Sequence, residues 1–129
     1  MNIIALDIGG TAVKYGLFLD KKEEFGQFSV YNSDGTEDVL RNLYNFLNNY
    51  KGDCISISAP GPFDFKTGTS NMKHKLTSIY GIGLKKILEE KFVNTAVSFI
   101  HDSASFAYGV MYEKPKLVKR SFSCIMLGT

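Results

Sequence analysis

The stretch Ile3-Ile4-Ala5-Leu6-Asp7-Ile8-Gly9-Gly10-Thr11 decides how the N-terminal part of this chain folds. An apolar run leads through Asp7 into two glycines, and a second apolar run, 13–19, follows at once. The pattern predicts two strands joined by a glycine turn. Glycines let backbone N–H groups approach an anion closely, Thr11 adds a hydroxyl donor, and Asp7 suits a hydrated Mg²⁺ beside a phosphate. The alternative is a plain Gly-Gly hairpin in which Asp7 is only a turn residue.

The composition indicates one globular domain. A length of 129 residues is enough for a core of its own, and a formal net charge of +2 predicts neither a nucleic-acid footprint nor a membrane patch. No apolar run approaches the roughly 20 residues of a membrane span. Cys54 and Cys124 stand in apolar runs and are expected to be buried, reduced thiols. We therefore expect a cytoplasmic protein.

Hydrophobic periodicity predicts strands and helices along the rest of the chain. Strands are expected at 2–7, 13–19, 25–31, 54–58, 96–100 and 121–127. Helical spacing is found at 39–47, 84–92 and 103–112, and the aromatic residues of the last segment suit a packed helix. The corner Ala59-Pro60-Gly61-Pro62 ends a strand, because proline cannot continue the ladder of hydrogen bonds.

Four motifs follow one another in a recognisable order. They are Asp7-Ile8-Gly9-Gly10-Thr11; Ala59-Pro60-Gly61-Pro62 with Asp64 and Thr67-Gly68; Asp102 before an Ala-rich helix; and Leu127-Gly128-Thr129. The series resembles the N-terminal half of the ROK family of sugar kinases and repressors. That resemblance implies an α/β fold, a ribonuclease H-like lobe of the actin-like ATPase type, with a mixed five-stranded sheet flanked by helices. Residues 1–129 would form this single lobe, with the second lobe absent from the chain.

The resemblance also implies a function. Family members bind ATP and a sugar between two lobes, so we expect an ATP-dependent kinase for a sugar of the hexose or N-acetylhexosamine type. The absent lobe would carry the family's zinc-binding cysteines and most of the adenine pocket, and the complete protein is expected to be a homodimer. The chain is expected to be cut at Gly128-Thr129, to fold alone, and to be inactive as an isolated lobe.

The phosphate side of the expected site rests on the first, third and fourth motifs. By resemblance, Asp102 is the catalytic base, and a base must lie within about 3 Å of the hydroxyl it deprotonates. Helix N-cap is the alternative role for Asp102. Asp7 would hold Mg²⁺ through water, and Gly9, Gly10 and Thr11 would cradle the transferred phosphate. Gly128 and Thr129 resemble the start of a second phosphate loop.

The sugar side departs from the family pattern. Gly61, Pro62, His101 and Asp102 are expected to line it, although a plain strand-exit turn is an alternative for the proline corner. His101 stands where the family usually has a sugar-binding asparagine, and Lys75 replaces a second one. Neutral imidazole still offers one donor and one acceptor.

Two other function classes remain open. A ROK-type repressor would carry an N-terminal helix-turn-helix, whereas this chain enters its first predicted strand by residue 3. A sugar- or nucleotide-binding module without catalysis is the third class, and it is favoured by His101 and Lys75.

Overall fold

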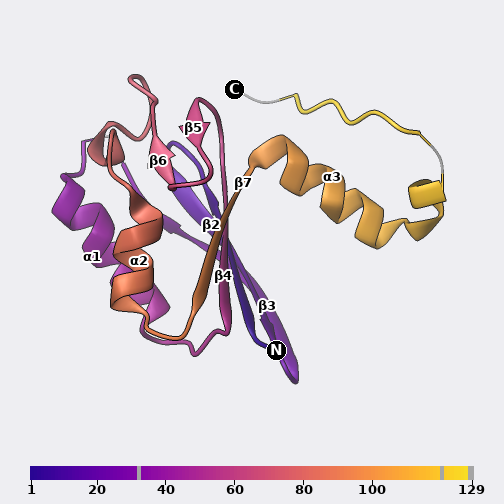
Figure 1. The fold of residues 1–129 in the computed structure, drawn as a ribbon, viewed down its shortest axis with the longest axis horizontal. Coiled ribbons are helices and arrows are strands. Elements are labelled where there is room, and N and C mark those ends of the chain that lie inside the picture. Colours follow the sequence, from indigo (N-terminus) through magenta and orange to yellow (C-terminus); the bar gives the residue numbers. More distant parts are fainter. Residues whose placement is uncertain (32, 120, 128–129) are drawn as a thin grey trace.

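A computed structural model describes residues 1–31, 33–119 and 121–127 of the chain (Figure 1). Its main sheet has five strands in the order β3-β2-β1-β4-β7. The strands are β1 (Ile3–Ile8), β2 (Ala12–Leu19), β3 (Lys22–Ser29), β4 (Cys54–Ala59) and β7 (Ala96–His101). The first three form an antiparallel meander, and β4 and β7 run parallel to β1. The expected mixed five-stranded sheet is confirmed.

The helices are distributed unevenly around this sheet. In Figure 1, α1 (Thr36–Leu47) and α2 (Leu84–Lys91) lie together on one side, whereas α3 (Asp102–Glu113) extends away from the sheet. A small hairpin, β5 (Phe63–Asp64) and β6 (Thr69–Ser70), follows the proline corner, and two 3₁₀ turns are η1 (Thr77–Ile79) and η2 (Pro115–Lys119). None of the helices in these ranges has the length and apolar character needed to cross a bilayer.

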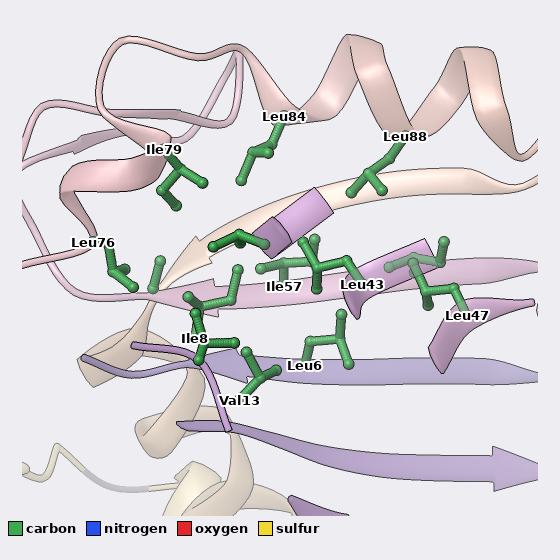
Figure 2. Close-up of a cluster of buried hydrophobic side chains, with 14 of the residues drawn as sticks. Leu6, Ile8, Val13, Leu43, Leu47, Ile57, Leu76, Ile79, Leu84 and Leu88 are labelled. Carbon is green, nitrogen blue, oxygen red and sulfur yellow. The ribbon is translucent and has the colours of Figure 1, made fainter. Parts of the chain in front are cut away.

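The core lies between the sheet and the first two helices (Figure 2). Alternate residues of a strand share a face, so β1 and β4 each direct a row of apolar side chains toward α1 and α2. Each helix packs apolar residues, spaced four positions apart along one stripe, against these rows. Each fully buried side chain of this kind contributes about 1.5–3 kcal/mol. The residues concerned are Ile4, Leu6, Ile8, Ile55, Ile57, Val39, Leu43, Leu47, Leu84 and Leu88.

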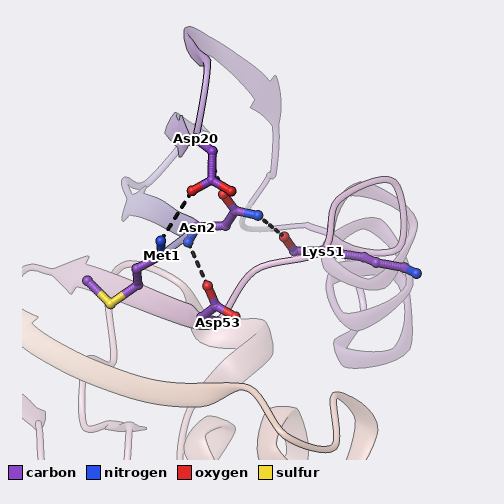
Figure 3. Close-up of polar contacts among 5 residues, drawn as sticks. All are labelled: Met1, Asn2, Asp20, Lys51 and Asp53. Carbon is purple, nitrogen blue, oxygen red and sulfur yellow. Dashed lines mark hydrogen bonds and ion pairs between the residues drawn. The ribbon is translucent and has the colours of Figure 1, made fainter.

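Polar contacts at the N-terminal end of β1 join three segments (Figure 3). The Asn2 N–H donates to Asp53 Oδ2 at 2.7 Å, and the Asp20 N–H donates to Asn2 Oδ1 at 3.0 Å. The Met1 ammonium also pairs with Asp20 Oδ1 at 3.2 Å. These bonds tie the start of β1 to the β2–β3 turn and to the loop before β4, so this end of the sheet has a structural role.

Two predicted elements differ from the structure. Residues 121–127 form no strand in the part of the chain that is described. An apolar run becomes a strand only where a neighbour pairs with it, and the sheet ends at β7 instead. The segment 103–112 is helical as expected but is not packed, since α3 buries none of its side chains, and Phe106, Tyr108 and Tyr112 are exposed.

Smaller differences concern a strand boundary and the thiols. β3 begins at Lys22, three residues before its predicted start, because Leu19 and Lys22 pair across a two-residue turn. Cys54 and Cys124 are free as expected, but each is only partly buried. Cys54 occupies the strand face turned away from α1 and α2, which explains its exposure.

Candidate functional site

Three separate segments meet at one edge of the sheet. The parallel strands β1, β4 and β7 end there, and the register aligns Asp7 with Ser58 and Ser58 with Ile100. Two strand spacings, about 10 Å, therefore separate the backbone at Asp7 from the backbone of β7 just before Asp102. Ligands of open α/β sheets bind outside the carboxyl ends of the strands. The topology thus brings the glycine turn, the proline corner and Asp102 to the same edge.

The glycine turn is a tight hairpin in which two amides make no hydrogen bond to the described residues. The Gly9 N–H donates to the Ala12 carbonyl at 3.0 Å, and the Thr11 carbonyl accepts from the Val30 N–H at 3.1 Å. A Cβ on Gly9 would lie 3.0 Å from the Ala12 oxygen, so the turn favours glycine there. The amides of Gly10 and Thr11 have no protein partner among the described residues. The groups left to bind a phosphate are therefore these two amides and the Thr11 hydroxyl, because the Gly9 N–H already donates inside the turn.

Asp7 is exposed and held by a neighbour on β4. The buried Ser58 hydroxyl donates to Asp7 Oδ1 at 2.6 Å. Asp7 also pairs in register with Lys14 of β2. A hollow of about 230 Å³ joins these three side chains to Ser105 in the first turns of α3. Ser58 was missed by the sequence analysis, and its signal would have been the strand register that places it beside Asp7.

Asp102 begins α3 next to two polar neighbours. Its Oδ1 accepts from the Ser103 N–H at 2.6 Å and lies 2.9 Å from His101 Nδ1. The Ser103 N–H also approaches His101 Nδ1, at 3.2 Å, and the Ser103 hydroxyl lies 2.7 Å from the same nitrogen. The N-cap of α3 is His101, whose ring nitrogen accepts from the Ser103 N–H, so the capping alternative for Asp102 was wrong. Asp102 is the first residue of the helix, and 28% of its side chain stays exposed.

His101 lies against the proline corner. A Cβ on Gly61 would be 3.3 Å from His101 Nε2, and the imidazole also packs against the Phe65 ring, with centroids 5.5 Å apart. Gly61 and His101 thus lie next to each other. A hollow of about 410 Å³ opens at the proline corner, and it is lined by 60–62 and 71–75.

The second part of the proline motif has a structural explanation. Asp64 Oδ1 accepts from the backbone N–H of Lys66 at 2.9 Å. The pKa of Asp64 lies below its usual range, first because the Thr67 side chain donates a hydrogen bond to the carboxylate and second because the Lys66 amide does. Gly68 has φ 68°, and a Cβ there would lie 2.6 Å from the Phe99 ring. These residues close the β5–β6 hairpin.

A hydrated Mg²⁺ fits the donors at the glycine turn. This ion is usually held by one or two carboxylates, several waters and substrate phosphates. Asp7 keeps Oδ2 for such a role while Ser58 holds Oδ1. Nowhere in the described ranges do three His, Cys, Asp or Glu side chains converge as metal ligands. The expected second phosphate loop at Gly128 and Thr129 lies outside the described residues.

Solved structures share this architecture. A ROK family protein from Streptococcus pneumoniae TIGR4, in complex with sucrose, is 24% identical with a TM-score of 0.72, over 90% of this chain and 39% of that one. A ROK family glucokinase from Streptomyces griseus, in complex with glucose and AMPPNP, is 21% identical with a TM-score of 0.65, over 86% of this chain and 36% of that one. At these identities the likeness shows the fold.

The sequence relationship is closer. A beta-glucoside kinase from Listeria monocytogenes serovar 1/2a is 37% identical over 92 residues, which are 69% of this chain and 31% of the relative. The chain thus spans about a third of that relative's length. The model of the ROK family matches residues 3–129, almost the whole sequence. With the ribonuclease H-like lobe and the glycine turn in place, the chain belongs to the ROK family.

Proposed function

We propose that the complete protein is an ATP-dependent sugar kinase and that this chain forms one wall of its active site. The observation that carries the proposal is the parallel register of β1, β4 and β7, which gathers the glycine turn, Asp7 and Asp102 at one edge. Phosphoryl transfer needs positioning and charge stabilisation more than covalent chemistry. A sheet edge that has a proton-accepting carboxylate and two amides without a partner among the described residues suits that need.

Asp102 is the proposed general base. Its carboxylate would take the proton from the attacking sugar hydroxyl as the new O–P bond forms and the bond to the ADP oxygen breaks. The Ser103 N–H fixes the carboxylate, and partial exposure leaves it accessible to a hydroxyl. His101, seated between Gly61 and Phe65, would supply Nε2 to the sugar.

The glycine turn is the proposed phosphate site. The Gly10 and Thr11 amides and the Thr11 hydroxyl would donate to phosphate oxygens, because close approach is open only where side chains are small. Asp7 would hold hydrated Mg²⁺, which neutralises phosphate charge when bound. Ser58 would orient the Asp7 carboxylate through its 2.6 Å hydrogen bond.

The proposed sugar is of the hexose type. The Listeria relative is a beta-glucoside kinase, and the solved Streptomyces glucokinase contained glucose with an ATP analogue. The hollow lined by Gly61 and Pro62 at the proline corner offers room for such a ligand. A sugar with an N-acetyl group remains within the same class of substrate.

The test is Asp102→Asn in the full-length protein, assayed with ATP and a panel of hexoses, hexosides and N-acetylhexosamines. Turnover is expected to fall about 10²–10⁴-fold, the usual contribution of a general base, while ATP binding is retained. Asp64→Asn is the matched control, since Asp64 is also a hydrogen-bonded carboxylate but belongs to a hairpin turn. Equal turnover of wild type and Asp102→Asn would remove Asp102 as the base, and a wild type inactive on the whole panel would refute the kinase.

A further inference from the structure

The segment 72–76 brings the side chain of one basic residue, Lys75, close to the glycine turn. Its two ends are fastened by Met72 and Leu76, which are only 4% and 2% exposed and belong to the core cluster, of which Figure 2 labels Leu76. Lys73, His74 and Lys75 between them are exposed. Because both anchors are buried, the position of the intervening backbone is set by the core.

Lys75 alone of these three residues reaches the turn. A Cβ built on Gly10 would lie 3.7 Å from Lys75 Cδ and 4.0 Å from Lys75 Cγ. Outside the turn itself, no other residue of the described chain comes within 4 Å of that position. The aliphatic stem of Lys75 therefore lies beside Gly10, and the ammonium, two bonds beyond Cδ, is within reach of this side of the turn.

The same side chain also borders the proline corner. Lys75 lines the 410 Å³ hollow together with Pro60, Gly61 and Pro62. It therefore lies between the proposed phosphate site at Gly10 and the proposed sugar site at Gly61. A phosphoryl group passing from ATP to a sugar hydroxyl would have to occupy the region between these two sites.

We propose that Lys75 is a phosphate-binding residue whose ammonium contacts the phosphoryl group during transfer. The inference rests on the proposed function. Two backbone amides alone offer partial charges, whereas an ammonium forms charge-assisted hydrogen bonds that are roughly twice as strong. The cation also offsets the repulsion between the Asp7 carboxylate and the phosphate oxygens. Lys75 thus supplies a phosphate contact from a position where the family usually places a sugar contact.

The experiment compares Lys75→Ala, Lys75→Arg and Lys66→Ala in the full-length protein. Lys66 is the matched control, because it is an exposed lysine of the β5–β6 hairpin that lines neither the hollow at Asp7 nor the hollow at Gly61 and makes no contact with Gly10. For Lys75→Ala we expect kcat/KM for ATP to fall about 10- to 100-fold, the range for one charge-assisted hydrogen bond. KM for the sugar should stay within about twofold, and Lys75→Arg should recover most of the rate.

Calorimetric titration with ATP and Mg²⁺, and with adenosine as a phosphate-free probe, separates this inference from the kinase itself. Lys75→Ala should weaken ATP binding and leave adenosine binding and Tm unchanged. If wild type transfers no phosphate but its ATP affinity still depends on Lys75, the kinase fails and the phosphate contact stands. Equal ATP binding and equal kcat/KM for ATP in the Lys75→Ala and Lys66→Ala proteins would overturn the inference, as would a loss confined to KM for the sugar.

Discussion

The two faces of the five-stranded sheet differ in what covers them. Toward α1 and α2, β4 directs Ile55, Ile57 and Ala59, each at most 1% exposed. Its opposite face carries Cys54, Ser56 and Ser58. On that open face the neighbouring strands add Ala5, Asp7, Lys14 and Gly16, beside an exposed edge-to-face pair of Phe18 and Phe25 with centroids 5.7 Å apart.

The contrast separates stability from chemistry. The covered face is continuous and apolar, so it contributes most of the burial that holds the domain together. The open face has small and polar residues, which add little burial but leave the Asp7 carboxylate exposed at the edge of the sheet. Substitutions at successive positions of β4 should therefore alternate between large and small losses of stability.

The largest expected effect on stability comes from the covered face. Ile57→Ala should lower the free energy of unfolding by about 2–5 kcal/mol, because Ile57 is fully buried and its loss leaves a cavity between sheet and helices. Ser56→Ala, one residue earlier on the open face, should stay within about 0.5 kcal/mol. Urea denaturation of both proteins measures the difference. Similar losses at the two positions would mean that the open face is also covered in solution.

A smaller effect is expected where the open face supports the site. Ser58→Ala should lower stability by about 1 kcal/mol, since it removes the hydrogen bond to the Asp7 carboxylate. A double-mutant cycle with Asp7→Ala should give a coupling energy of about 0.5–1.5 kcal/mol. If the two substitutions are additive, the bond between these side chains contributes nothing and Ser58 does not orient Asp7.

The smallest expected effect is a pH-dependent change in Tm. It concerns a glutamate at the polar rim of the covered face. Glu24 has a pKa below its ordinary value of 4.5, because the Lys22 ammonium donates a hydrogen bond to it and attracts its charge. A lowered carboxyl pKa in the folded state gives stability that is present above the unfolded pKa and lost as pH falls through the folded one. Wild type should therefore exceed Glu24→Gln in Tm at neutral pH, with the gap closing below about pH 4.5. A gap that stays constant down to pH 2 would contradict the ion pair.

Local patterns were sufficient for most of the elements. Alternating apolar residues predicted the strands of the main sheet, and four-residue spacing predicted α1 and α2, because both signals arise within one element. The two-residue strands β5 and β6 were missed, since they are too short to show a period. The run 121–127 was predicted as a strand because its apolar residues look alike whether or not a neighbour pairs with them.

The sequence by itself determined the glycine turn, the ends of the parallel strands and the family to which they point. Only the tertiary structure decided that Ser58 holds Asp7, that His101 rests between Gly61 and Phe65, and that Lys75 lies against Gly10. It also decided that α3 packs against neither face of the sheet with a buried side chain. Helix and strand periods depend on neighbours along the chain, whereas these contacts join residues 36 or more positions apart and depend on register and core packing.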